Sequence, residues 1–99
     1  MPENPLKVFE SLDPALLNAL EGDRELAFGE GALPVKYKYL VAMALDASHG
    51  AVGGVASLAR SAVDAGATKQ EVTEALRVAW FVTGAGSVYT AGNALAGMF

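Results

Sequence analysis

Signals for the starts of helices constrain this chain more than any other feature of its sequence. Asn4-Pro5 and Asp13-Pro14 each place a capping side chain directly before a proline. A proline is well tolerated at the first helical position, because the N–H that it lacks would have no partner there. Pro34 suits the same position, and Thr68 with Glu71 has the spacing of a capping box. The chain is therefore expected to consist of helices that begin at defined residues.

Apolar residues between these signals recur with helical spacing. Val55, Ala59 and Ala62 belong to one such stripe, and the run Tyr39–Leu45 is apolar on all sides, which predicts a central, enclosed helix. No segment alternates polar and apolar residues as a half-exposed strand would. We predict an all-α fold with about six helices, at 5–11, 14–27, 34–48, 51–65, 69–83 and 87–97.

The balance of apolar and charged residues bears on assembly. The 99 residues suffice for a single domain, 1–99, and 53% of them are hydrophobic while 18% are charged. A domain of this size has too much surface to bury so many apolar side chains by itself. We therefore predict a homo-oligomer, with a monomer of unusually apolar surface as the alternative.

Charge is unevenly distributed along the chain, whose formal net charge is -4. The first 34 residues hold seven acidic and two basic side chains, and the remainder is near balance. Residues 1–32 are accordingly expected to form an acidic, solvated helical segment that covers a more apolar inner part. The basic residues are scattered, so we expect no binding to nucleic acid.

Composition also bears on location and cofactors. The start of the sequence has neither a basic segment nor an apolar core, so no signal peptide is expected. The absence of cysteine excludes disulfides and thiolate metal sites, and it fits a cytoplasmic protein. With a single histidine, no metal site and no cofactor are expected.

The last 22 residues, Val78–Phe99, carry no charge and are long enough to span a bilayer. Four glycines and several polar residues interrupt this run, and Gly84-Ala85-Gly86 within it is a turn signal. We therefore interpret the run as a helix pair at a subunit interface and expect no membrane association.

Three motifs give the chain a family resemblance. They are Leu33–Ala47 (LPVKYKYLVAMALDA), Ala65–Val72 (AGATKQEV) and Glu74-Ala75-Leu76. Together they resemble the carboxymuconolactone decarboxylase family, whose fold is shared by alkylhydroperoxidase D-like proteins. The resemblance covers about residues 33–95. It implies an all-α orthogonal helical bundle assembled as a homo-oligomer, a trimer or hexamer.

The resemblance also shows which chemistry this chain lacks. Peroxidase-type members carry Cys-x-x-Cys, a histidine four residues later and a glutamate one helix earlier. The corresponding positions here are Ala51, Gly54, Leu58 and Tyr39, so all four groups are missing. Peroxide reduction by that mechanism needs an attacking thiolate and a resolving thiol. Thiol peroxidase activity is therefore not supported. Gly53-Gly54 within a predicted helix fits either a close helix crossing or room for a ligand.

His49 is the remaining candidate for a catalytic acid or base near this position. Histidine ordinarily titrates near neutrality, which suits proton transfer. It lies at the predicted join of two central helices, close to where the redox pair would lie. The alternative is a histidine that only hydrogen-bonds a helix terminus. Asp46, one turn earlier, is placed either to orient His49 or to face solvent.

Basic and phenolic side chains supply the candidate ligand-binding residues. They could bind the carboxylate or carbonyl group of a small organic acid, although solvated surface charge and core packing are the structural alternatives. These residues are Lys36, Tyr37, Tyr39 and Arg60. Trp80 is expected to be a packing anchor, with a place in the lining of a pocket as the alternative.

Three functions follow from these observations. The first is a carboxymuconolactone decarboxylase-like protein that acts on or binds a small organic acid, as a cysteine-independent lyase with His49 as its acid or base. The second is a catalytically degenerate binding or scaffold protein that kept the oligomeric fold. The third is a redox accessory protein that uses the thiols of a partner.

Overall fold

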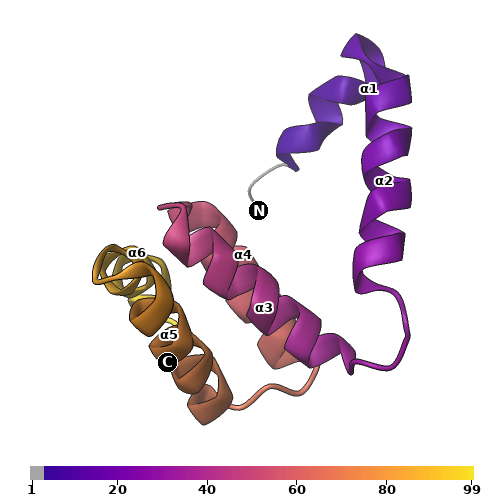
Figure 1. The fold of residues 1–99 in the computed structure, drawn as a ribbon. Helices are drawn as coiled ribbons and strands as arrows, with labels where there is room; N and C mark the ends of the chain where they lie inside the picture. The colour runs from indigo at the N-terminus through magenta and orange to yellow at the C-terminus, as the bar shows by residue number, and fades with distance from the viewer. Residues whose placement is uncertain (1–3) are drawn as a thin grey trace.

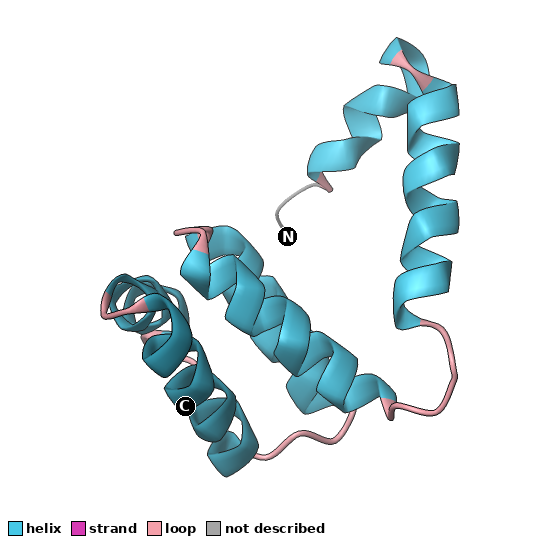
Figure 2. Cartoon of the chain, in the orientation of Figure 1, coloured by secondary structure: helices cyan, strands magenta, loops and turns pink. Residues whose placement is uncertain are grey.

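The computed structural model describes residues 4–99, and every regular element among them is helical (Figure 2). The all-α prediction is therefore confirmed. The first predicted helix is divided into a 3-10 turn and a single α-helical turn. The elements are η1 (Pro5–Val8), α1 (Phe9–Leu12), α2 (Pro14–Phe28), α3 (Val35–Ser48), α4 (Val52–Asp64), α5 (Lys69–Thr83) and α6 (Gly86–Leu95).

The predicted caps are present at the helix starts. Asn4 Oδ1 accepts a hydrogen bond from the backbone N–H of η1, and Asp13 Oδ1 accepts one from α2. At α5 the Glu71 N–H donates to Thr68 Oγ1 over 3.0 Å, and the Thr68 N–H donates to Glu71 Oε1 over 2.9 Å. Helix α3 begins at Val35, one residue later than predicted, so Pro34 is its N-cap and not its first helical residue.

Replacing Thr68 by alanine removes one half of this capping box. We expect Thr68→Ala to lower the free energy of unfolding by about 1 kcal/mol, because the Glu71 N–H loses its partner at the helix start. Urea unfolding monitored by circular dichroism measures the change. Thr68→Ser keeps the hydroxyl and serves as the control, so an equal loss in both variants would contradict the assignment.

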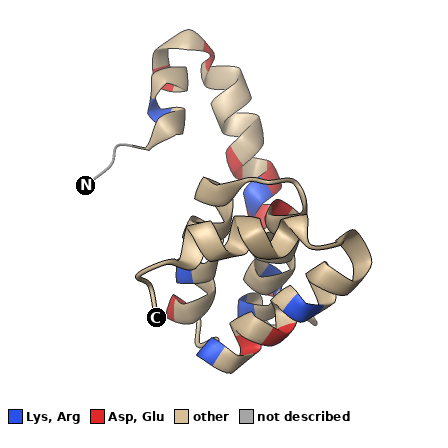
Figure 3. Ribbon diagram, turned by 90° about the vertical axis from the view of Figure 1, so that its left-hand side faces the viewer, with Lys and Arg blue, Asp and Glu red and all other residues tan. Residues whose placement is uncertain are grey.

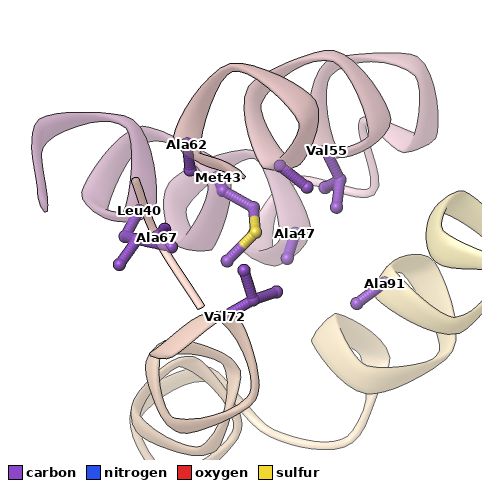
Figure 4. Packing of buried hydrophobic residues seen from close by; sticks show 9 residues of the cluster. Leu40, Met43, Ala47, Val55, Ala62, Ala67, Val72 and Ala91 are labelled. Carbon is purple, nitrogen blue, oxygen red and sulfur yellow. The ribbon is translucent and has the colours of Figure 1, made fainter. Parts of the chain in front are cut away.

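Helices α3–α6 form the bundle, in which α3 lies alongside α4 and both pack against α5 and α6 (Figure 1). Met43 is fully buried and extends from α3 toward Val72 of α5 (Figure 4). Most of the other buried side chains are small, which lets the helix axes approach closely. The core consists of Leu40, Met43, Ala47, Val55, Ala59, Ala62, Ala67, Val72 and Ala91.

Helix α3 is not enclosed on all sides within one chain, so that prediction is wrong. Leu40, Met43 and Ala47 are buried, whereas Val41 and Leu45 are 54% and 57% exposed. The reason is that the other bundle helices cover only the side of α3 that bears the buried residues. An apolar strip of α3 therefore remains open in the single chain.

Residues 4–28, which we call the N-terminal arm, stand apart from the bundle (Figures 1 and 3). None of the residues in η1, α1 and α2 is buried. At the base of the arm, Phe28 stacks on Tyr39 with ring centroids 5.0 Å apart, and Lys38 Nζ donates to the Gly29 carbonyl. These contacts hold only the end of the arm against α3, and the rest of the arm extends away from the bundle (Figure 1). The expectation that this acidic segment covers the apolar inner part is therefore wrong within one chain.

The uncharged run at the C-terminal end is divided between two helices, as its turn signal predicted. Helix α5 ends at Thr83, and Gly84 adopts a φ of +95°, which glycine accommodates readily. Helix α6 begins two residues later. Among residues 4–99, no helix has both the length and the apolar character needed to cross a membrane.

Candidate ligand site between α5 and α6

The two positions of the missing thiol pair are half-buried at the start of α4. Ala51 is the N-cap of α4, and Gly54 lies in its first turn. A side chain at Gly54 would clash with the Asp46 carboxylate, whereas nothing lies within 4 Å of a Cβ atom placed at Gly53. The space beside Gly54 is therefore occupied by a side chain of α3, whereas the space beside Gly53 is open. The half-buried Asp46 side chain faces α4 at Gly54.

His49 is the C-cap of α3, and its backbone N–H donates to the Leu45 and Asp46 carbonyls. The residue is exposed, and within residues 4–99 its ring makes no hydrogen bond. Lys36 lies at the start of α3 and His49 at its end, 13 residues later. At the helical rise of 1.5 Å per residue, the two residues are about 20 Å apart along the helix axis. One chain therefore does not bring His49 together with Lys36 and Tyr37.

Lys36, Tyr37 and Glu71 form a cluster where the start of α3 meets the start of α5. Lys36 Nζ lies 3.0 Å from Glu71 Oε2 and 3.2 Å from Oε1, and it is 5.0 Å from the centroid of the Tyr37 ring. The hydrogen bond from the Thr68 N–H makes the largest contribution to lowering the pKa of Glu71, and the hydrogen bond from Lys36 makes the next largest. The hydrogen bond to Glu71 raises the pKa of Lys36. Lys36 is therefore engaged within the protein, and its availability to a ligand carboxylate is reduced.

These pKa directions give the cluster a pH-dependent part in stability. Because the pKa of Glu71 is lowered in the folded state, its contribution is present above the ordinary glutamate pKa of roughly 4.3. The contribution is lost as the pH falls through the lower, folded value. We expect Glu71→Gln, which keeps a capping-box residue, to flatten this acid dependence in urea unfolding measured from pH 7 to pH 3. An unchanged slope would contradict the assignment.

The other two predicted ligand-binding residues are separated from this cluster. Tyr39 is half-buried, stacks on Phe28 and packs against the core. Arg60 is exposed on α4, and within the described chain it has no ion-pair partner. The four predicted residues therefore do not converge on one site in the single chain.

An open cavity of about 520 Å³ lies between α5 and α6. Its walls are mainly apolar, and Thr73 and Arg77 are its polar and basic residues. Trp80 is 52% exposed and lines this cavity, so in the single chain the alternative of a pocket-lining residue holds and the packing anchor does not. The lining residues are Thr73, Leu76, Arg77, Trp80, Val88, Ala91, Gly92 and Leu95.

Arg77 is not among the ligand-binding residues predicted from the sequence, although the sequence carries a signal for it. Thr73, Arg77 and Trp80 follow one another at intervals of four and three residues, which places them on one side of α5. A cation next to a tryptophan and a threonine on one helix face is a pattern that fits a ligand site. The sequence pattern did not show that α6 packs beside this face of α5 and forms the opposite wall of the cavity.

The fold and the site together define a class of protein. It is an all-helical bundle in which the thiol positions are occupied by alanine and glycine, and its largely apolar cavity between two helices carries an arginine. Within residues 4–99, no cluster of three histidine or acidic side chains is placed to hold a metal ion.

The family model of the carboxymuconolactone decarboxylase family matches residues 14–96, and the chain belongs to this family. The match includes α2, the longest helix of the N-terminal arm, as well as the whole bundle. No curated protein and no solved structure gives a significant match. Family membership and the missing cysteines confirm a carboxymuconolactone decarboxylase-like protein without the Cys-x-x-Cys motif.

Proposed function

We propose that this protein binds a small organic acid with an apolar body in the cavity between α5 and α6, with Arg77 as the partner of its carboxylate. The observation that supports this proposal is the placement of a single arginine at an apolar cavity of about 520 Å³. Within residues 4–99, Arg77 has no ion-pair partner, whereas Lys36 is paired with Glu71. Arg77 is thus the better placed cation for a ligand.

The chemistry of the lining favours this class of ligand. A guanidinium group offers two parallel N–H donors that match the two oxygens of a carboxylate. Leu76, Trp80 and Leu95 provide apolar surface for the body of the ligand. Thr73 donates its hydroxyl to the Lys69 carbonyl, so its oxygen is oriented as an acceptor and not as a donor.

Trp80 is the single tryptophan of the chain and lines the cavity, so its fluorescence reports binding directly. The test is a titration of the full-length protein with hexanoate and, in parallel, with its neutral analogue hexanamide. We expect hexanoate to change the Trp80 emission in a saturable manner and to bind more tightly than the amide. Equal affinity for the two compounds, or no saturable change with either, would overturn the proposal.

The proposed assembly is a homo-oligomer, a trimer or hexamer. Large apolar side chains on α3, α5 and α6 support it, since Val41, Phe81 and Tyr89 are 54%, 83% and 77% exposed in the single chain. Static light scattering coupled to gel filtration measures the mass of the particle. A mass equal to that of one chain would overturn this part of the proposal.

His49 is proposed as an acid or base for a cysteine-independent, decarboxylase-like reaction. Because its ring is exposed and distant from Lys36 along α3, this role requires a second copy to enclose it. The test is the release of carbon dioxide from a carboxylate that the wild-type protein turns over. We expect His49→Ala to abolish release and the neighbouring Ser48→Ala to retain it; full activity of His49→Ala would exclude the role.

A catalytically degenerate scaffold protein is the second candidate. The packing of Asp46 against Gly54 favours it, because the position of the second cysteine in the peroxidase-type members has become a structural contact. This candidate predicts an intact oligomer that shows no saturable response to hexanoate. The Trp80 titration and the mass measurement together therefore distinguish the two functions.

A further inference from the structure

The N-terminal arm and a groove on the bundle are two apolar surfaces that one chain leaves uncovered. On the arm, Leu12, Leu16 and Leu20 are 69%, 42% and 39% exposed. On the bundle, two adjoining cavities of about 470 and 260 Å³ lie between α3 and α5 and share Val41, Ala44 and Val78. We call them the α3/α5 groove, which is lined mainly by Tyr37, Leu40, Val41, Ala44, Leu45, Ala75, Val78, Ala79 and Val82.

We propose that the N-terminal arm of one copy lies in the α3/α5 groove of a second copy. This inference rests on the homo-oligomer proposed above and specifies which surfaces form its contact. In the observed arrangement only the end of the arm, at Ala27 and Phe28, lies near its own groove, where it shares a cavity with Val41 and Leu45, and the rest of the arm stands apart from the bundle (Figure 1).

The dimensions of the two surfaces agree. Apolar residues of α2 extend from Leu16 to Ala27, which is about 16 Å along a helix. The groove extends from Glu71 to Thr83 along α5, which is about 18 Å by the same measure. An α-helix can pack in such a groove between two other helices, with its apolar residues inserted between theirs.

Charge supports a contact between arm and bundle over a contact between two arms. Residues 4–28 carry five acidic and two basic side chains, whereas residues 35–99 carry four acidic and five basic ones. Two arms would therefore repel each other, while an arm and a bundle carry net charges of opposite sign. The groove itself carries Glu71 and Glu74 at one end, and Glu71 is paired there with Lys36, whose Nζ lies 3.0 Å from Glu71 Oε2.

The absence of cysteine makes this proposal directly testable, because introduced cysteines are the only thiols. One full-length chain carries Leu20→Cys on the arm, and a second, distinguished by a size tag, carries Val78→Cys in the groove. The two chains are co-expressed and treated with a bismaleimide. We expect a cross-linked product that contains one chain of each kind.

Asn18→Cys is the matched control for the arm. Asn18 is exposed on the same helix and lies about 200° around it from both Leu16 and Leu20, on its opposite side. We expect several-fold less cross-linking to Val78→Cys from Asn18→Cys than from Leu20→Cys. Equal yields from both arm positions would overturn the proposal, because they indicate random collision and not a defined contact.

Other occupants of the groove give different products. Cross-linking between two Leu20→Cys chains in preference to the mixed product would show that arms pack on each other and would overturn the proposal. A third chain carries both Leu20→Cys and Val78→Cys. Cross-linking only within this chain would show that the arm folds onto its own bundle and would overturn the proposal. Absence of the mixed product from a particle of oligomeric mass would refute the arm contact alone, whereas a monomeric mass would refute the assembly itself.

Discussion

We expect Met43→Ala to lower the free energy of unfolding by about 2–5 kcal/mol, the largest effect of any single change considered for this fold. Met43 is fully buried and lies where α3 and α4 meet α5 (Figure 4). Its neighbours include several alanines, whose short side chains cannot move into the space that the truncation would leave. The cavity would therefore persist, and its lining would lose packing contacts.

Met43→Leu is the control for this prediction. Leucine nearly conserves the volume of methionine, so the expected cost is below about 1.5 kcal/mol. Urea unfolding at one fixed chain concentration measures both variants, because the stability of an oligomer depends on concentration. A cost for Met43→Ala no larger than that for Met43→Leu would show that Met43 is not the centre of the core.

We expect Arg77→Gln to weaken the binding of hexanoate by about 10-fold to 100-fold, which corresponds to the loss of one charge-assisted hydrogen-bonded contact. Glutamine keeps a polar side chain of similar reach but removes the positive charge at the cavity. The Trp80 fluorescence titration measures the change in affinity. Binding of hexanamide should change little, because an amide has no charge to pair with Arg77.

Arg60→Gln is the matched control for the charge itself. It removes the same charge from an exposed position on α4 that does not line the cavity. We expect wild-type affinity for hexanoate from this variant. A similar loss of affinity in Arg60→Gln and Arg77→Gln would mean that net charge, and not a contact at the cavity, governs binding.

The features of the fold that depend on local chemistry could be predicted from the sequence. The caps at Asn4, Asp13 and Thr68 involve residues close together in the chain, and the structure shows all three. The turn at Gly84 follows from the conformational freedom of glycine in the same way. Local signals therefore placed the helix boundaries within a few residues.

Features that depend on how the helices pack could not be predicted in this way. The exposure of Val41 and Trp80 is decided by which faces of α3 and α5 the other helices cover. Periodicity identifies an apolar face but does not identify its partner. For the same reason the sequence grouped Lys36 and Tyr37 with His49, although α3 holds them at its two ends. Only the packed bundle shows Arg77 beside a cavity.

The burial of Met43 also bears on how the protein withstands oxidants. With no cysteine in the chain, its sulfur atoms all belong to three methionines, and the one at the centre of the core is fully enclosed. Oxidation of Met43 to the sulfoxide would place a polar group in that core and destabilise it. As long as the bundle stays packed, the oxidant cannot reach the Met43 sulfur and this damage does not occur. Hydrogen peroxide should then oxidise Met43 at the rate at which the bundle opens, whereas the half-buried Met98 is open to direct reaction.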